Sequence, residues 1–335
     1  MAKKFKELVE ILGGHRVFIQ THNFPDQDAV ASAFGLQVLL RHFGIDTTIC
    51  HHGVVERAVT ANLVADLGVE MLIDETDNDH TAMTKDDYII IVDSQKGSGN
   101  IDDLIGEEVA CVDHHPTFVT VDDYKYMDVR IVGSCSSIIA DYYRECDVNM
   151  PESVATALLY GLKCDTKNFT RGVTDFDVEI FSYLFPKSNQ QQIRKYQAAE
   201  IEYSELNAFS DSLRNIEIYN EVGFAFLDFP CKEGFIATVS DFILEIDLVK
   251  FVVVYTRRPN GFKFSVRSEV DELDAGQIIS EALKNVGSGG GHKSMAGGFA
   301  DEEKILAMNI DFNKVIQNLF LNVINKVPPH GLTIN

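Results

Sequence analysis

Three short apolar runs in the first part of the chain each end on side chains of the kinds that bind metal ions. The runs cover residues 17–21, 88–92 and 109–112, and the side chains that follow them are His22, Asp26, Asp28, Asp93, Asp113, His114 and His115. In an open α/β sheet, ligands bind just beyond the carboxyl ends of the strands, so three such ends can converge on one crevice. Carboxylates and imidazoles gathered there would form a metal centre.

The first cluster spans a turn centred on Pro25. His22, Asp26 and Asp28 stand at positions i, i+4 and i+6, and Pro25 holds the chain extended as it enters the turn. Either Asp alone would simply cap the following helix. One His and two Asp at a strand end favour metal binding instead, with His22 and Asp26 facing one ion and Asp28 reaching a second.

The other candidates are less specific when each is taken alone. Asp93 at the end of a strand is either a ligand or a helix cap, and Asp165 at the end of an apolar helix is typical of a surface helix terminus. The arrival of residues 113–115 on another strand favours the ligand interpretation of Asp93. The second pair of adjacent histidines, His51-His52, is interpreted as part of a loop.

The elements that must position these groups follow from the hydrophobic pattern of the first half. Short apolar runs alternate with helical patterns, which is typical of a mostly parallel sheet covered by helices. We predict a helix over 29–43 that stops at Gly44, a strand over 46–51 and a helix over 57–67. The first half is therefore predicted to be a doubly wound α/β domain.

Helical patterns continue through the middle of the chain. One predicted helix ends at Cys146, another covers 154–162, and Thr174 with Asp177 has the spacing of a capping box for a third. Residues 189–214 are polar, lack Gly and Pro, and carry a weak helical stripe. We interpret this segment as a linker helix.

The second half returns to strands. The predicted elements are strands over 216–219, 223–227, 250–257 and 262–267, a helix over 275–283, a glycine-dense loop over 287–293 and a closing helix over 303–323. The chain is thus predicted to form an α/β domain over 1–188, the linker helix over 189–214, and a smaller α+β domain over 215–335.

The composition is that of an ordinary globular protein. Of the 335 residues 45% are hydrophobic and 24% are charged, and the six scattered cysteines form no C-x-x-C pair, which argues against a thiolate zinc site. No apolar stretch is long enough to span a bilayer, and the first residues lack the apolar core of a signal peptide. We therefore expect a cytoplasmic protein without membrane contact.

The net charge limits the partners. With 51 acidic against 29 basic residues the chain carries a formal charge of −22, which repels polyanions over most of its surface. A long duplex nucleic acid held by a broad basic face is therefore not expected. A short anionic substrate, held locally by metal ions and a few basic groups, is compatible with this charge.

Taken together, these side chains resemble a known family. In order and approximate spacing they are similar to the four motifs of the DHH phosphoesterases, namely His22-x-x-x-Asp26-x-Asp28, Asp93, Asp113-His114-His115 and Asp165. The loop Gly289-Gly290-Gly291-His292 resembles the signature of the DHH-associated C-terminal domain. The resemblance covers residues 15 to 300.

The resemblance implies a pair of manganese ions. One ion would be held by His22, Asp26 and Asp93, and the second by Asp28, Asp93, His114 and Asp165. Asp93 would bridge the two ions. Ligand type alone leaves cobalt, iron, zinc and magnesium open as well.

The same resemblance assigns roles around the ions. His115 would face the substrate phosphate and act in catalysis together with Asp93, while Asp113 would orient an imidazole from behind. Two divalent ions about 3.5–4 Å apart clamp the attacking and leaving oxygens and make a water between them more acidic. Such a pair fits phosphoester hydrolysis.

The second domain would then select the substrate. By resemblance to related phosphodiesterases, Arg267 and Ser268 at a strand end become candidates to hold a terminal phosphate or carboxylate, although a solvated edge arginine is as common. Gly290, Gly291 and His292 would let backbone N–H groups approach a phosphate. A flexible surface turn is the alternative for this loop.

The leading hypothesis is a manganese-dependent phosphoesterase for short nucleotides: an oligoribonuclease, a phosphatase of 3′-phosphoadenosine 5′-phosphate, or a hydrolase of cyclic or linear di-adenylate. An inorganic pyrophosphatase or exopolyphosphatase is the alternative within this class, but Lys263, Arg267 and Lys293 are sparse for a substrate that is all charge. A non-catalytic protein that binds nucleotide or single-stranded nucleic acid is the alternative outside it. Family members are often dimers, so the resemblance also raises the expectation of a homodimer.

Overall fold

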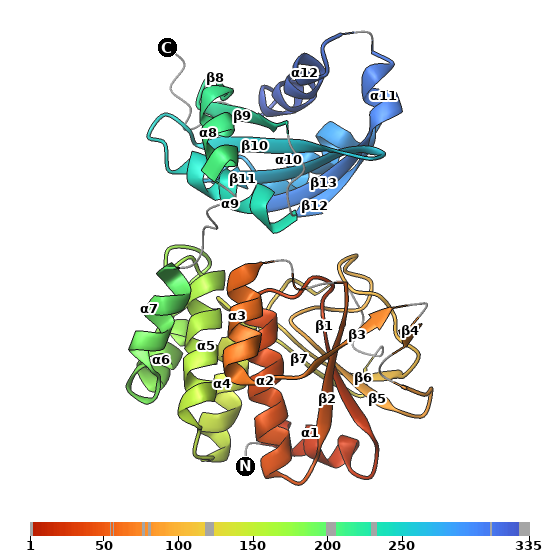
Figure 1. Cartoon of the computed structure of the whole chain (residues 1–335), viewed down its shortest axis with the longest axis vertical. Helices are drawn as coiled ribbons and strands as arrows, with labels where there is room; N and C mark the ends of the chain where they lie inside the picture. The colour runs from red at the N-terminus through yellow and green to blue at the C-terminus, as the bar shows by residue number, and fades with distance from the viewer. Residues whose placement is uncertain are drawn as a thin grey trace. The chain divides into compact units, whose positions relative to one another are not determined.

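Two compact units, Met1–Glu200 and Ile201–Asn335, make up the computed structural model of the chain (Figure 1). The structure describes residues 3–53, 55, 57–75, 78–79, 82–117, 124–198, 206–228, 233–308 and 310–327. Within these ranges, no helix is long and apolar enough to cross a membrane.

The first unit is built on a seven-stranded sheet with the order β4-β3-β2-β1-β5-β6-β7. The strands are β1 (Val17–Thr21), β2 (Thr47–His52), β3 (Met71–Glu75), β4 (Asn78–Asp79), β5 (Tyr88–Val92), β6 (Glu107–Asp113) and β7 (Tyr126–Val129). Neighbouring strands are parallel except at the edge, where β4 runs antiparallel to β3. The predicted doubly wound, mostly parallel sheet is confirmed.

The strand order creates a switch point between β1 and β5. Strand β1 pairs with β2 on one side and with β5 on the other, so the chain builds the sheet outward in one direction and then returns to the other side of β1. Both strands are apolar and almost entirely buried, as expected of central parallel strands. Open α/β sheets bind ligands at the carboxyl ends of strands that flank such a point.

The helices of this unit are α1 (Lys3–Leu12), α2 (Gln27–His42), α3 (Ala58–Leu67), α4 (Cys135–Cys146), α5 (Glu152–Asp165), α6 (Asp175–Leu184) and α7 (Gln190–Ala198). Helix α2 contacts strands β1, β2 and β5 and also helices α4 and α5. This enclosure explains why its sequence is apolar nearly all round. In Figure 1, helices α4 to α7 form the layer beyond α2. The capping box predicted for α6 is confirmed, with Thr174 and Asp177 bonded reciprocally.

The second unit is a six-stranded sheet with the order β12-β13-β11-β10-β9-β8. Its strands are β8 (Glu217–Tyr219), β9 (Val222–Leu227), β10 (Phe251–Arg258), β11 (Gly261–Ser268), β12 (Gly287–Gly291) and β13 (Met295–Asp301), and its helices are α8 (Leu206–Arg214), α9 (Glu233–Leu244), α10 (Ala275–Leu283), α11 (Glu302–Leu306) and α12 (Phe312–Ile324). Strands β9 and β10 are parallel and the other pairs are antiparallel. The predicted α+β architecture is confirmed.

Two details of the second unit differ from the sequence predictions. The glycine-dense segment is not a loop but the edge strand β12, because β13 supplies a partner and a Cβ at Gly287 would collide with the backbone of that partner. The predicted closing helix is two helices, α11 and α12, because the Asp311 side chain caps the start of α12. The predicted linker segment contains α7 in the first unit and α8 in the second, and residues 199–205 lie outside the described residues.

The close packing of α2 depends on Gly35. A Cβ at this position would lie 3.0 Å from a methyl carbon of Ile139 and 3.1 Å from one of Leu158, tighter than ordinary van der Waals contact. We predict that Gly35→Val lowers the free energy of unfolding by about 1–3 kcal/mol, because the added methyl groups overpack this core. Urea denaturation measures the change. Gly13→Ala is the control, since its Cβ would lie 3.6 Å from the nearest atom; equal stability of both variants would contradict the packing described.

Candidate metal centre

The six predicted metal ligands lie together at the carboxyl ends of the central strands. His22 follows β1, Asp26 and Asp28 stand at the start of α2, Asp93 follows β5, His114 follows β6, and Asp165 ends α5. They fall into two groups, each with ligand atoms within 4.8 Å of one another: His22 with Asp26 and Asp93, and Asp28 with His114 and Asp165. Apart from Asp93, which the second group lacks, these groups correspond to the two ligand sets that the sequence suggested. Asp93 also lies with Asp113, His114 and His115 in a third group.

Asp93 stands between the two groups. Its Oδ2 lies 3.8 Å from Nε2 of His22, and its Oδ1 lies 3.4 Å from Nε2 of His114. The same ring nitrogens also face a second carboxylate: His22 Nε2 is 3.9 Å from Asp26 Oδ1, and His114 Nε2 is 3.1 Å from Asp165 Oδ2. One carboxylate therefore faces both groups, which is what a ligand shared by two ions requires.

The two imidazoles are oriented by backbone carbonyls. Nδ1 of His22 lies 2.8 Å from the carbonyl oxygen of Asn23, and Nδ1 of His114 lies 3.0 Å from that of Val132. A carbonyl can only accept, so each Nδ1 carries the proton and donates it. The Nε2 lone pair of each neutral ring is then available to a metal ion, as in most histidine metal sites.

Asp93 has the features of an unsatisfied ligand. It is 3% exposed, and its Oδ1 is buried without a hydrogen-bond partner among the described residues. Its φ of 60° lies in the left-handed region, which costs a residue other than glycine of the order of 1–3 kcal/mol. A buried carboxylate oxygen left open in a strained backbone fits a position that a cation completes.

Asp28 is held by the start of helix α4. The backbone N–H of Cys135 donates to its Oδ2 at 2.7 Å, and that of Ser136 donates to its Oδ1 at 3.0 Å. The positive end of the helix dipole adds to this stabilisation. Helix α5 closes over the same group, since a Cβ at Gly161 would lie 2.9 Å from Asp28 Oδ1 and would collide with Ser136 Oγ.

Asp177 supports that turn from behind and was not identified as a site residue from the sequence. Its fully buried carboxylate accepts hydrogen bonds from the Gly133 N–H at 2.8 Å and from Ser137 Oγ at 2.7 Å, on either side of the residues that hold Asp28. The only sequence signal was the capping box with Thr174. Oδ2 of Asp177 thus caps α6 through the Thr174 N–H, and both carboxylate oxygens anchor the start of α4.

The carboxylates of the centre repel one another. Burial, followed by the charges of Asp93 and Asp165, raises the pKa of Asp28 well above its ordinary value. Burial also raises the pKa of Asp165 to about 6, against the opposing charge of His114. The cluster therefore has a surplus of negative charge that favours bound protons or cations.

The pKa values of the two imidazoles, His22 and His114, are raised as well. Burial alone would lower the pKa of His22, but the neighbouring carboxylates of Asp26 and Asp93 raise it to about 9. Burial likewise opposes protonation of His114, and the carboxylates of Asp93 and Asp165 outweigh it. A site that draws protons onto two buried imidazoles is one whose negative charge suits divalent cations, so the residues present fit a metal pair.

His115 lies beside the centre and is oriented by Asp113. Its Nδ1 donates to Asp113 Oδ1 at 2.8 Å, and Gln95, a residue not identified from the sequence, donates to the other oxygen at 2.7 Å. Burial opposes ionisation of Asp113, but these partners lower its pKa to about 2. The carboxylate raises the pKa of His115. The hydrogen bond between His115 and Asp113 thus supports the predicted role of Asp113 in orienting an imidazole.

Arg171 is a further basic group that the sequence did not single out. Its Nη2 donates to the backbone oxygen of Asp165 at 2.8 Å, and its Nε is buried without a hydrogen-bond partner among the described residues. The charge of Arg171 opposes the rise in the pKa of Asp165 that burial causes. It places a guanidinium next to the ligand that ends α5.

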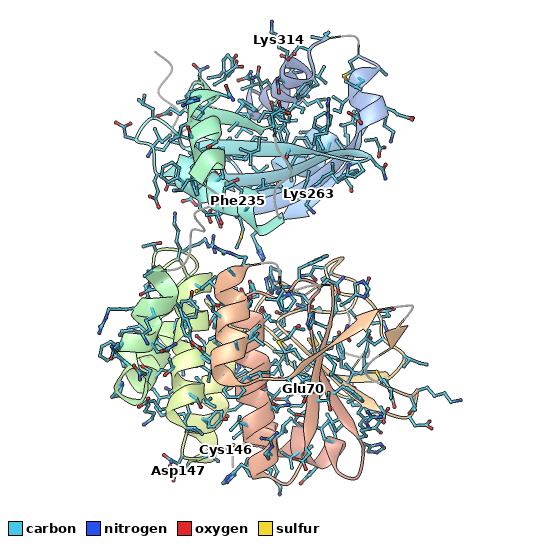
Figure 2. All side chains as sticks on the ribbon, in the orientation of Figure 1. Glu70, Cys146, Asp147, Phe235, Lys263 and Lys314 are labelled. Atoms are coloured by element: carbon cyan, nitrogen blue, oxygen red, sulfur yellow. The ribbon has the colours of Figure 1, made fainter. Side chains whose placement is uncertain are left out.

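The predicted substrate-binding residues of the second unit are only partly gathered. A pocket of about 320 Å³ is lined by residues that include Lys263, Phe264, Arg267, Gly291, His292 and Gly297; Lys263 is labelled in Figure 2. Gly290 is exposed and has no atom within 4 Å of an added Cβ. Ser268 Oγ donates to the backbone oxygen of Val270 at 3.1 Å.

Arg267 is not a solvated edge arginine. It is 8% exposed, and its Nε donates to Asp241 Oδ1 on α9 at 2.7 Å while Nη1 donates to Ser265 Oγ at 3.1 Å. The guanidinium is therefore fixed in the pocket wall before any ligand arrives.

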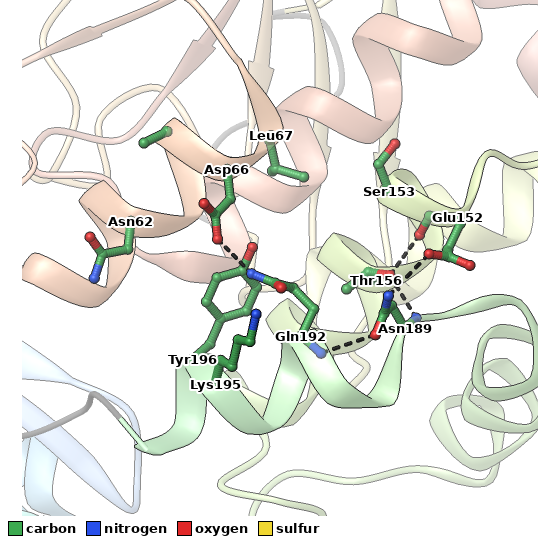
Figure 3. A pocket seen from close by; sticks show the side chains of 11 residues that line it. Asn62, Asp66, Leu67, Glu152, Ser153, Thr156, Asn189, Gln192, Lys195 and Tyr196 are labelled. Atoms are coloured by element: carbon green, nitrogen blue, oxygen red, sulfur yellow. Dashed lines mark hydrogen bonds between the residues drawn. The ribbon is translucent and has the colours of Figure 1, made fainter.

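A separate hollow of about 520 Å³ lies in the first unit among α3, α5 and α7 (Figure 3). Its polar groups largely bond one another: Gln192 donates to Asp66 at 2.5 Å, and Asn189 donates to Glu152 at 3.2 Å. Among the described residues that line it, none is a predicted ligand. We assign it no part in the chemistry.

The fold and the two ligand groups define an α/β protein with a candidate metal centre at the carboxyl ends of its central strands. Residues 16–162 match the model of the DHH family N-terminal domain, and residues 220–318 match the DHHA1 domain. The chain therefore belongs to the DHH family.

Curated relatives include two uncharacterized proteins of Methanocaldococcus jannaschii, both 26% identical to the chain. The first match covers 84% of the chain and 57% of the relative, and the second covers 87% and 89%. A probable manganese-dependent inorganic pyrophosphatase of Streptococcus pyogenes is 31% identical over 167 residues, which is 48% of the chain and 52% of that protein. The chain thus spans little more than half the length of the first and third of these relatives.

Solved structures share the fold. An exopolyphosphatase-related protein from Bacteroides fragilis has a TM-score of 0.74 at 19% identity, over 96% of both chains. RecJ from Thermus thermophilus in complex with Mn²⁺ has a TM-score of 0.52 at 14% identity, over 94% of this chain and 54% of its own. At such identities the likeness concerns the fold alone.

Gly161 offers a test of the metal centre that leaves every ligand in place. We predict that Gly161→Ala weakens Mn²⁺ binding about 10–100-fold, because the new methyl group displaces Asp28 and Ser136. Isothermal titration calorimetry measures the affinity. The exposed substitution Ser153→Ala on the same helix is the control and should bind Mn²⁺ like the parent. If Gly161→Ala gained helix stability and kept full affinity, Asp28 would not be a ligand.

Metal binding should release protons at neutral pH. His22, with a pKa of about 9, is protonated at pH 7 in the metal-free chain and must lose its proton to become a ligand. We therefore predict that Mn²⁺ affinity rises with pH and levels off above pH 9 or so. Calorimetry in buffers of different ionisation enthalpy counts the protons. Binding without proton release at pH 7 would contradict the assignment of His22.

Proposed function

We propose that this phosphoesterase uses two manganese ions to hydrolyse phosphoester bonds of short nucleotides. The observation that carries the proposal is the position of Asp93, whose two oxygens face the imidazoles of both ligand groups at 3.8 and 3.4 Å. His22, Asp26 and Asp93 would hold one ion, and Asp28, Asp93, His114 and Asp165 the other. When bound, such a pair supplies positive charge to the reacting phosphate and makes water more acidic.

The chain's own groups account for the remaining steps. His115 has its Nδ1 committed to Asp113, so its Nε2 is the atom that would donate a hydrogen bond to a substrate phosphate. Burial opposes protonation of His115, but the hydrogen bond to Asp113 raises its pKa above the ordinary value, so the ring keeps the proton that this donation needs to a higher pH than a free imidazole would. Asp113 therefore positions and charges the ring rather than reacting itself.

The preference for short nucleotides rests on charge. A net charge of −22 disfavours long polyanions, whereas a compact substrate needs only local compensation. The pocket of the second unit presents the fixed guanidinium of Arg267 among small lining residues such as Gly291 and Ala296, which suits a single terminal phosphate of a small substrate. Oligoribonucleotides, 3′-phosphoadenosine 5′-phosphate and cyclic or linear di-adenylate remain the candidate substrates.

Pyrophosphate hydrolysis is the second candidate. It is favoured by the similarity to the Streptococcus pyogenes protein, which covers about half of the chain. The pocket of the second unit argues against it, because Lys263 and Arg267 are its basic side chains apart from His292, and Arg267 is already paired with Asp241. A substrate made only of phosphate would need more cations.

A substrate panel tests the proposal directly. Linear di-adenylate, short RNA, 3′-phosphoadenosine 5′-phosphate and pyrophosphate are incubated side by side with the purified chain and Mn²⁺, and products are separated by chromatography. We expect turnover of at least one nucleotide and little of pyrophosphate. Pyrophosphate as the best substrate would establish the second candidate instead.

Asp93→Ala identifies the centre responsible for that turnover. The substitution removes a ligand that faces both groups, so activity should fall to the level of the metal-free chain. Asp86→Ala is the matched control, since Asp86 is exposed and should be dispensable. Near-normal turnover by Asp93→Ala with Mn²⁺ still bound would rule out this centre as the catalytic site.

A further inference from the structure

Phe24 has a left-handed backbone conformation at a position between two candidate metal ligands. It lies two residues after His22 and two before Asp26, between two members of the same ligand group. Its φ is 56°, in the left-handed region that bulky side chains rarely adopt. Gly or Asn would take this conformation with less strain. A large aromatic residue there calls for a reason other than turn geometry.

The surrounding chain holds Phe24 in this conformation. The Phe24 N–H donates to the carbonyl oxygen of His52 at 3.2 Å, and the Asn23 N–H donates to that of Asn100 at 2.8 Å. The Asn23 side chain also donates to Asp102 at 3.0 Å. The turn is therefore fixed from two sides, by the end of β2 and by the segment that follows β5. His51 and His52, interpreted from the sequence as a loop, belong to that end of β2.

The ring of Phe24 packs closely against Gly53. A Cβ at Gly53 would lie 2.8 Å from Cε1, 3.0 Å from Cδ1 and 3.1 Å from Cζ of the ring, so any side chain at this position would push the ring away. Gly53 itself has a φ of 76°, which also disfavours other residues. One side of the ring is thus supported by backbone.

The rest of the ring stays in solvent. Phe24 is 44% exposed, and no ring contact of Phe24 occurs among the described residues. Phe169 is a useful comparison, because its φ of 68° is similar but its ring packs edge-on against Phe181 with centroids 5.0 Å apart. Burial of apolar surface explains Phe169 and does not explain Phe24.

We propose that Phe24 is a stacking platform for a nucleobase of the substrate and so selects nucleotides over base-free phosphates. The inference rests on the proposed function and names the group that the site recognises beside the phosphate. An aromatic ring fixed on one side and open on the other stacks on any base, because every base has a π-face. Pyrophosphate has no group that could use this surface.

The test compares two substrates that differ only in the bases. Linear di-adenylate and its abasic analogue are hydrolysed by the full chain with Mn²⁺, and kcat and KM are measured for each. For Phe24→Ala we expect the KM for di-adenylate to rise about 5–100-fold while its kcat and both constants for the abasic analogue stay within about twofold. Phe24→Tyr, which keeps the ring, should behave like the parent. Phe24→Leu, which keeps apolar bulk without a π-face, should behave like Phe24→Ala.

Gly53→Val provides an independent variant, because it displaces the ring without changing it, and it should reproduce the rise in KM for di-adenylate. Mn²⁺ affinity, measured by calorimetry, should stay unchanged in the Phe24 variants. An equal loss on both substrates, or a KM for di-adenylate that Phe24→Ala leaves unchanged, would overturn the inference while the proposed function stands.

A binding measurement separates the two ideas if the parent chain hydrolyses neither substrate. A di-nucleotide that carries 2-aminopurine loses fluorescence when its base stacks. Quenching by the parent chain that is lost in Phe24→Ala would support the platform even though the hydrolase proposal had failed. Equal quenching by both proteins would overturn the platform as well.

Discussion

Repulsion among buried carboxylates is the constraint on which the rest of the first unit depends. Asp28 and Asp93 are 1% and 3% exposed, and Asp165 lies close enough to raise the pKa of Asp28. Ionised carboxylates in such a place are costly unless positive charge compensates them. In the metal-free chain, the raised pKa values of His22 and His114 compensate part of this negative charge. Divalent ions would supply more positive charge and a defined ligand geometry.

The fold holds these groups together through contacts from several elements. The N–H groups at the start of α4 fix Asp28, and Asp177 fixes the turn that presents them. Backbone carbonyls turn the two imidazoles so that each Nε2 faces the carboxylates. The centre therefore depends on how α2, α4 and α5 pack on the sheet as much as on the ligands themselves.

Local patterns were sufficient to find the ligands because strand ends are marked in the sequence. The apolar runs 17–21 and 88–92 coincide with β1 and β5, and the polar residues that follow them lie at the carboxyl ends of these strands. Asp26 shows that the two interpretations of motif one are compatible, since it caps α2 through the N–H groups of Asp28 and Ala29 and also lies 3.9 Å from His22. The DHH resemblance added the grouping into two sets.

Contacts between distant segments could not be predicted in the same way. Asp177 reaches the start of α4 only after α6 has packed, and its capping box gave no hint of that second role. Strand β12 forms by pairing with β13, and a glycine-rich sequence alone does not predict that pairing. Arg267 was predicted as a candidate to hold a terminal phosphate or carboxylate, and its hydrogen bond to Asp241 was not foreseen because the sequence did not suggest helix α9.

If the six ligands hold two ions that share Asp93, bound Mn²⁺ must show it in both stoichiometry and magnetism. Titration of the metal-free chain with Mn²⁺, followed by electron paramagnetic resonance, measures both. Two equivalents should bind per chain and give the spectrum of a magnetically coupled pair. One equivalent with the six-line spectrum of an isolated ion, or no specific binding at all, would contradict a shared Asp93.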